Sequence, residues 1–310
     1  MAGSKWTADR IPDLNGRTVV VTGANSGLGL ATVRELARHG AHVVLAVRDE
    51  DKGRRAAAAI SDVQPGARLE VRRLDLADLD SVRAFAAGMH DRGTGVDVLV
   101  NNAGVMAPPH TLNRHGQEVQ FAGNHLGHFA LTGLLLDLLH AGRDPRVVTV
   151  TSDLHRGARI HFDDLTGARS YAPMRFYRQS KFANVVFALE FDRRLRAAGS
   201  PVRSLLAHPG FSATNLQTSG PTGLLRTFVT LGRGLLAQDA ATGALPQLYA
   251  ATAPTVEGGQ FFGPDGFREL RGHPTTVRPD PAAEDPETAR RLWQLSEDLT
   301  GVSYAAALSA

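Results

Sequence analysis

Short runs of valine and leucine alternate with helical patterns along most of this chain of 310 residues. Continuous apolar runs are typical of strands that are buried on both faces, as in a parallel sheet. The alternation of such runs with helices predicts an α/β fold, a doubly wound parallel sheet of about seven strands with helices on both faces. The predicted strands are RTVVVTG (17–23), AHVVLAV (41–47), ARLEVRRL (67–74), VDVLVNN (96–102), RVVTVTS (146–152), PVRSLLAHPG (201–210) and GGQFFG (258–263). The predicted helices are 27–39, 50–61, 78–90, 117–140, 175–198 and 285–299.

The length of the chain permits one α/β domain or two smaller domains. Because the alternation continues almost to the end, we expect an N-terminal extension over 1–14 and a single domain over 15–310. Within it, 212–240 is rich in Gly, Ser and Thr with scattered apolar residues, and we expect it to form a substrate lid. The C-terminal segment, 264–310, contains a Pro- and Asp-rich surface connection before the last helix.

The composition excludes several kinds of site and partner. A formal net charge of +3 is close to balance and indicates no nucleic-acid partner. The absence of cysteine excludes disulfides, zinc thiolate sites and a Cys nucleophile. His125 and His128 are three residues apart but have no carboxylate or third histidine in their motif, which favours packing over a metal site. The N-terminus does not resemble a secretory signal, and FALTGLLLDLL (129–139) is too short to span a bilayer, so we expect a soluble, cytoplasmic protein.

A glycine-rich turn follows the first predicted strand. Gly23, Gly27 and Gly29 lie between this strand and the first helix, where glycine permits a tight turn. Backbone N–H groups at such a helix N-terminus can bind a pyrophosphate, so the turn indicates a Rossmann-type dinucleotide site. The spacing T-G-x-x-x-G-x-G differs from the common G-x-G-x-x-G. Methyltransferases also use a glycine turn here, and the turn alone does not separate the two classes.

The end of the second strand predicts the cofactor. An acidic residue at this point would bind a ribose 2′-OH, whereas an arginine would bind a 2′-phosphate. The strand ends in Val47-Arg48-Asp49, in which Arg48 is suited to a phosphate and Asp49 to capping the next helix. NADP(H) is therefore favoured, with NAD(H) as the alternative. Asp75 could accept a hydrogen bond from the adenine or cap a helix, although Asp78 is better placed for the cap.

The glycine turn and Asp75, together with four further motifs, resemble the short-chain dehydrogenase/reductase superfamily. In chain order the six are TGANSGLG (22–29), Asp75, NNAG (101–104), Ser152, Tyr177-x-x-x-Lys181 and Pro209-Gly210. NNAGVM, NHLGHFALT and the wide gap between Ser152 and Tyr177 resemble the retinol dehydrogenase-like and protochlorophyllide reductase-like branch. Residues 1–16 have no hydrophobic run like the N-terminal anchor of membrane-bound retinol dehydrogenases, so we do not expect an anchored protein.

The resemblance implies an active site of four residues. Tyr177 would be the general acid/base, Lys181 would lower its pKa and bind the ribose, and Ser152 would stabilise the substrate oxygen. Asn124 would bend its helix and hold a water that relays protons. Tyr171 is a rival phenol, but Arg175 rather than a lysine follows it by four residues. The cofactor-binding residues implied are Gly23, Asn25, Ser26, Gly27, Leu28, Gly29, Arg48, Asp75, Leu76, Asn102, Ala103, Gly104, Tyr177, Lys181, Pro209, Gly210 and Thr214.

The prediction is thus an NADP(H)-dependent oxidoreductase that interconverts an alcohol and a ketone or aldehyde, with a lipophilic substrate suggested by the apolar residues of the lid. Alternatives are a dinucleotide-sensing regulator on the same fold and an NAD-dependent epimerase or dehydratase. Relatives in this superfamily often assemble through the helices at 117–140 and 175–198, so a homodimer or homotetramer is a further expectation.

Overall fold

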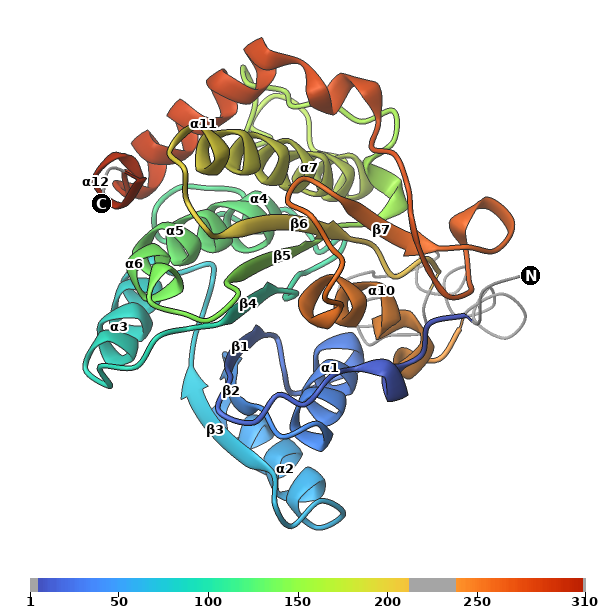
Figure 1. Cartoon of the computed structure of the whole chain (residues 1–310). Coiled ribbons are helices and arrows are strands. Elements are labelled where there is room, and N and C mark those ends of the chain that lie inside the picture. Colours follow the sequence, from blue (N-terminus) through green and yellow to red (C-terminus); the bar gives the residue numbers. More distant parts are fainter. Residues whose placement is uncertain (1–4, 212–237, 309–310) are drawn as a thin grey trace.

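One sheet forms the centre of the protein. The computed structural model describes residues 5–211 and 238–308. Its strands lie in the order β3-β2-β1-β4-β5-β6-β7-β8 (Figure 1). All neighbours pair in parallel except β7 and β8. The strands are β1 (Thr18–Thr22), β2 (His42–Val47), β3 (Arg68–Arg73), β4 (Val98–Asn101), β5 (Arg146–Val150), β6 (Arg203–Ala207), β7 (Phe261–Pro264) and β8 (Pro274–Thr276). The strand order reverses between β1 and β4, so the predicted doubly wound parallel sheet is confirmed.

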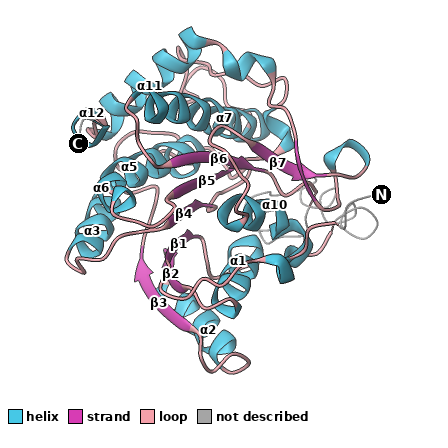
Figure 2. Ribbon diagram, in the orientation of Figure 1, coloured by secondary structure: helices cyan, strands magenta, loops and turns pink. Residues whose placement is uncertain are grey.

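Helices cover both faces of this sheet (Figure 2). Because side chains alternate along a strand, Val19 and Val21 of β1 pack in one apolar core while Val20 packs in the other. The first core includes α1, α2 and α10, and the second includes α3, α5 and α7. The bounds are α1 (Gly27–Arg38), α2 (Glu50–Ser61), α3 (Leu79–His90), α4 (Val119–Phe121), π-helical η2 (Ala122–Leu126), α5 (Gly127–Leu134), α6 (Leu136–His140), α7 (Pro173–Ala197), α10 (Ala240–Thr252), α11 (Pro286–Thr300) and α12 (Ala305–Leu308).

Three of these elements, β8, α10 and the short α12, were not predicted from the sequence. β8 lies in the segment predicted to be a surface connection, and it adds an eighth strand to the sheet. It begins at Pro274, which a sheet tolerates because β8 is an antiparallel edge strand. α10 contains Gly243 and Pro246, residues that interrupt helical patterns, yet its buried face packs on α1 and the sheet.

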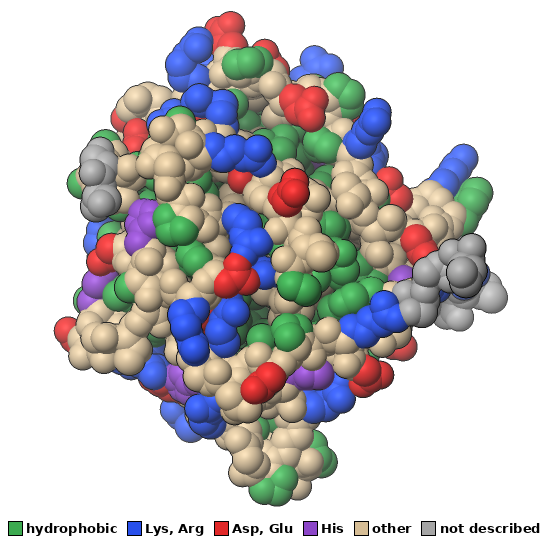
Figure 3. Space-filling model, in the orientation of Figure 1, with side chains coloured by type: hydrophobic (Ala, Val, Ile, Leu, Met, Phe, Trp, Pro, Cys, Tyr) green, Lys and Arg blue, Asp and Glu red, His purple; other side chains and the backbone are tan. Residues whose placement is uncertain are grey.

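Helix α11 covers α7, which carries Tyr177. Figure 1 shows α11 lying across α7 on the side away from the sheet. Trp293 of α11 packs against Phe129 and Phe187, with ring centroids 5.3 and 5.9 Å apart. Helix α11 of the same chain thus covers apolar residues on the outer side of α7. Formation of a homodimer or homotetramer through α7 stays a prediction. On the face shown in Figure 3, acidic and basic side chains are interspersed. No helix in the described ranges is both long enough and apolar enough to cross a bilayer.

Candidate active site

The glycine turn lies at the point where the strand order reverses. It connects β1 to α1, and Gly23 and Gly27 have φ angles of 65° and 54°, which favour glycine. Gly29 has a different constraint. A Cβ added there would lie 2.4 Å from the Gly23 carbonyl oxygen and 2.7 Å from Asn102 Nδ2. The turn is therefore packed too closely for any side chain at Gly29, as expected for a glycine that lets the helix pack closely against the strand.

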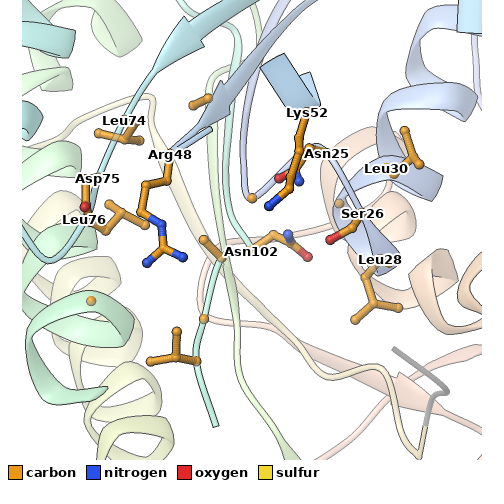
Figure 4. Close-up of a pocket in the computed structure, with 18 of the residues that line it drawn as sticks. Asn25, Ser26, Leu28, Leu30, Arg48, Lys52, Leu74, Asp75, Leu76 and Asn102 are labelled. Carbon is orange, nitrogen blue, oxygen red and sulfur yellow. The ribbon is translucent and has the colours of Figure 1, made fainter. Parts of the chain in front are cut away.

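A pocket of about 710 Å³ opens beside this turn (Figure 4). Thirteen of the predicted residues line it: Gly23, Asn25, Ser26, Gly27, Leu28, Gly29, Arg48, Asp75, Leu76, Asn102, Ala103, Gly104 and Asn124. Ser152, Tyr177, Lys181, Pro209 and Gly210 do not line it, although a Cβ at Gly104 would lie 3.4 Å from Lys181 Nζ. The pocket thus holds most of the predicted cofactor residues and reaches the predicted catalytic group at one end.

Three cations surround the end of β2. Arg48 points into the pocket, and Lys52 and Arg55 of α2 also line it (Figure 4). Lys52 and Arg55 were not predicted from the sequence, although their spacing of three residues places them on one face of α2. Asp49 caps α2, as predicted, since its side chain accepts a hydrogen bond of 3.0 Å from the Lys52 amide. The cluster of Arg48, Lys52 and Arg55 fits an anion such as a 2′-phosphate.

The two acidic residues after β3 have separate contacts. Asp78 caps α3, as favoured above, by accepting from the Asp80 amide at 3.0 Å. Asp75 lines the pocket, and one of its oxygens accepts from the Ala77 amide at 3.0 Å. The Asp75 carboxylate retains acceptor capacity toward a ligand because a carboxylate accepts several hydrogen bonds.

Thr22 orders the turn that follows β4 and was missed by the sequence analysis. Its buried hydroxyl accepts hydrogen bonds from the amides of Asn102 and Ala103, both at 2.9 Å. The Asn102 side chain donates to the Thr22 carbonyl at 2.8 Å. These bonds fix the backbone of NNAG against the glycine turn, so the two loops form one wall of the pocket.

The predicted catalytic phenol and amine are both buried. Tyr177 and Lys181 lie on α7, and only 4% and 3% of their surfaces are exposed. Lys181 Nζ lies 5.9 Å from the centroid of the Tyr177 ring and donates to the Val150 carbonyl at 3.2 Å. Ser152, directly after β5, shares a hydrogen bond with Tyr177 and also accepts from the Leu154 amide at 3.3 Å. Ser152 is therefore both a helix cap and a partner of the phenol.

Asn124 lies in the π-helical segment η2. Its Oδ1 accepts from the Val105 amide at 2.8 Å, and its Nδ2 donates to the Val105 carbonyl and to Ser180 Oγ, both at 2.9 Å. Ser180 in turn donates to the Tyr177 carbonyl at 2.8 Å. A π-helical turn interrupts regular hydrogen bonding and is frequent at functional sites. Ser180, which the sequence analysis did not include, thus connects Asn124 to the helix of Tyr177.

In the protein without cofactor, burial raises the pKa of Tyr177 to about 12, against a smaller opposing effect of Ser152. The predicted lowering of this pKa depends on Lys181 together with the positive charge of a bound oxidised nicotinamide, so it stays a prediction. Burial also lowers the pKa of Lys181 to about 8. In the protein alone, the loss of solvation is the largest cause of both shifts. Tyr177 is therefore protonated at neutral pH, and Lys181 is mostly charged.

Lys181→Met is expected to stabilise the protein without cofactor. Below pH 8 the folded state holds a buried ammonium whose pKa is about 8, compared with an ordinary lysine pKa of 10.5. Removing this charge should raise the free energy of unfolding by on the order of 2 kcal/mol, after the lost bond to Val150 is included. The gain should shrink as the pH rises from about 8 to 10.5, because wild-type Lys181 then becomes neutral in both states. Urea unfolding across this pH range measures the effect, with exposed Lys52→Met as the control; a less stable Lys181→Met at neutral pH would contradict it.

The Pro209-Gly210 turn follows β6. Gly210 has φ 64°, and a Cβ there would lie 2.5 Å from the Leu270 carbonyl oxygen, so both conformation and space require glycine. Thr214 lies outside the described residues, as does most of the predicted lid at 212–240. The rival phenol Tyr171 precedes α7 and donates to the Pro108 carbonyl at 3.0 Å.

A doubly wound sheet, a glycine turn beside a pocket, and adjacent Ser, Tyr and Lys side chains define an oxidoreductase that uses a nicotinamide dinucleotide. A model of the short chain dehydrogenase family matches residues 17–223. The chain belongs to this family of NAD(P)-dependent oxidoreductases, within its retinol dehydrogenase-like branch.

Similar proteins extend over nearly the whole chain. Human retinol dehydrogenase 13 is 42% identical over 293 residues, covering 93% of this chain and 85% of its own length. Mouse polyprenol dehydrogenase is 40% identical over 295 residues, covering 94% and 86%. A crystal structure of an uncharacterized protein from Mycobacterium paratuberculosis has 46% identity and a TM-score of 0.81, covering 97% of this chain and 99% of that one.

Proposed function

We propose that the protein is an NADP(H)-dependent oxidoreductase that interconverts an alcohol and a ketone or aldehyde. The observation that carries the proposal is the link from Asn124, which lines the pocket with the glycine turn, through Ser180 to the helix that carries Tyr177 and Lys181. The cluster of Arg48, Lys52 and Arg55 supports NADP(H) over NAD(H). Among similar solved structures, a protein from Beutenbergia cavernae named as an NAD(P)-dependent gluconate 5-dehydrogenase, 27% identical with a TM-score of 0.63, contains NADP bound at low occupancy.

The residues fit the cofactor because the glycine turn at the N-terminus of α1 lines the pocket, which continues from this turn to Asn124. When bound, the nicotinamide supplies or accepts a hydride. In the reducing direction, the protonated hydroxyl of Tyr177 gives its proton to the carbonyl oxygen of the substrate. The Ser152 hydroxyl donates a hydrogen bond to the same oxygen as negative charge develops. Asn124 would hold a water, and Lys181 would bind the ribose of the cofactor. Through these groups Tyr177 would regain the proton that it gives to the substrate.

The walls around Tyr177 support a lipophilic substrate. Met106, Ala107 and Met174 pack against the Tyr177 ring, so the surroundings of the phenol are apolar. Thioethers adapt to irregular apolar shapes, which suits a flexible hydrocarbon next to the carbonyl. Two relatives named above, a retinol dehydrogenase and a polyprenol dehydrogenase, carry the names of lipophilic alcohols.

Turnover of NADPH with a panel of carbonyl compounds tests the proposal. We expect oxidation of NADPH with apolar aldehydes or ketones, and slower turnover with small polar carbonyls of equal reactivity. Fluorescence of the bound nicotinamide measures binding separately. Binding of NADPH without turnover across the panel would favour the dinucleotide-sensing regulator, and absence of binding would overturn both readings.

A further inference from the structure

We propose that Glu269 is a positioning residue, which holds two loops of the active site in a fixed relation. The inference rests on the function proposed above. The two loops are 152–156, which begins at Ser152, and 208–211, which contains Pro209-Gly210. Glu269 lies in the turn between β7 and β8, outside the part of the chain that the family model matches. Figure 1 shows this turn on the side of the sheet toward which the parallel strands point.

The Glu269 carboxylate bonds to both loops. Its Oε2 accepts from His208 Nε2 at 2.9 Å, and Arg156 Nη2 donates to its Oε1 and Oε2 at 3.2 and 3.0 Å. The tautomer of His208 follows from its contacts: Nδ1 accepts from the Gly210 amide at 3.3 Å, so Nε2 carries the proton given to Glu269. The hydrogen bond from His208 keeps the pKa of Glu269 low, with Arg156 acting in the same direction.

The backbone on the β6 side is held at the same place. The Phe211 amide donates to the Leu270 carbonyl at 2.8 Å, directly after Glu269. Gly210 is packed so closely on Leu270 and Glu269 that a Cβ would lie 2.5 and 2.9 Å from their carbonyl oxygens. A shift of Glu269 therefore requires a shift of the Pro209-Gly210 turn.

The loop after β5 is held from the same hairpin. His155 is fully buried, and its Nδ1 donates to the Ser152 carbonyl at 2.7 Å while its Nε2 accepts from the Asp280 amide at 3.1 Å. Arg156 Nη2 also donates to the Arg278 carbonyl at 2.9 Å. The segment from Glu269 to Asp280 thus fixes Ser152 as well as Pro209-Gly210.

The backbone at Glu269 indicates that its position is imposed. Arg268 and Glu269 have φ angles of 51° and 57°, which are unfavourable for residues with a Cβ. Such conformations persist when surrounding contacts hold them, and they are concentrated near functional sites. Here the contacts of Glu269 with His208 and Arg156, and the hydrogen bond from Phe211 to the next residue, Leu270, supply that restraint.

Glu269→Ala tests the proposal. Without the carboxylate the two loops lose their common partner, and misplacement of the reacting groups should lower kcat by about ten- to a hundredfold. The adenosine half of the cofactor binds in a pocket that Glu269 does not line, so the Kd for adenosine 2′,5′-bisphosphate should stay unchanged. Glu269→Gln keeps an oxygen for His208 and should recover part of kcat. The matched control is Glu284→Gln, an exposed carboxylate in the same C-terminal segment, which should leave kcat unchanged.

Three results would overturn the positioning role: unchanged kcat in Glu269→Ala, parallel losses of kcat and bisphosphate affinity, or additive effects of Glu269→Ala and Arg156→Met. Parallel losses of kcat and bisphosphate affinity would indicate a general loss of structure. Additive effects of the two substitutions would indicate that Glu269 and Arg156 act independently. If the wild-type protein has no turnover, the emission shift of bound NADPH replaces kcat as the readout for the nicotinamide end. Failure of wild-type NADPH binding would instead refute the proposed function, so the two failures are distinguishable.

Discussion

Tyr177→Phe is expected to lower kcat for carbonyl reduction about a thousandfold, because a positioned proton donor contributes roughly 10²–10⁴ to such reactions. The substitution removes one oxygen atom from a ring that is packed against Met106, Ala107 and Met174. The ring and its packing remain, so binding of NADPH should be nearly unchanged. Single-turnover oxidation of NADPH with excess aldehyde measures the step directly, and cofactor fluorescence gives the binding constant.

Tyr171→Phe is the matched control for this prediction. It removes the same oxygen from a phenol only six residues away, whose hydroxyl donates to the Pro108 carbonyl at 3.0 Å. We expect Tyr171→Phe to keep most of the turnover. Retained activity in Tyr177→Phe, or a loss confined to Tyr171→Phe, would mean that the proton donor has been assigned to the wrong residue.

The sequence predicted the sheet well because its strands are buried on both faces. Continuous apolar runs such as VVV (19–21) leave few alternatives to a central parallel strand, and all seven predicted runs contain strands of the structure. β8 could not be predicted in this way, since an exposed edge strand that begins with proline has no apolar pattern. α10 was missed because Gly243 and Pro246 lower helical propensity, whereas burial against α1 and the sheet stabilises the helix.

The candidate site was predicted where its residues are close in sequence. Tyr177 and Lys181 lie on one helix, and Gly23, Gly27 and Gly29 lie in one turn, so spacing alone indicates their proximity. The contact between His208 and Glu269 joins residues 61 positions apart and has no pattern of its own. The pKa of Tyr177 was also beyond the sequence, because its direction depends on how completely the protein excludes water from the phenol.

The double substitution Arg48→Ala/Lys52→Ala is expected to reverse cofactor preference. Hydrogen bonds to charged groups contribute about 1.5–3 kcal/mol each, so two lost contacts with a 2′-phosphate should lower kcat/KM for NADPH by roughly 10²–10⁴. NADH has no such phosphate, and its kcat/KM should change little. Steady-state kinetics with both cofactors and one aldehyde measure the ratio, and each single variant should lie between the double variant and wild type.

Arg54→Ala is the control on the same helix. Arg54 pairs with Asp51 at 2.7 Å and does not line the pocket, although it has the same charge and lies between Lys52 and Arg55. Its removal should leave the preference for NADPH intact, which separates a direct phosphate contact from the general positive potential of α2. Equal losses with NADPH and NADH in the double variant would place Arg48 and Lys52 away from the 2′-phosphate. Wild-type preference for NADH would show that a solvated arginine at the end of β2 had been mistaken for a phosphate ligand.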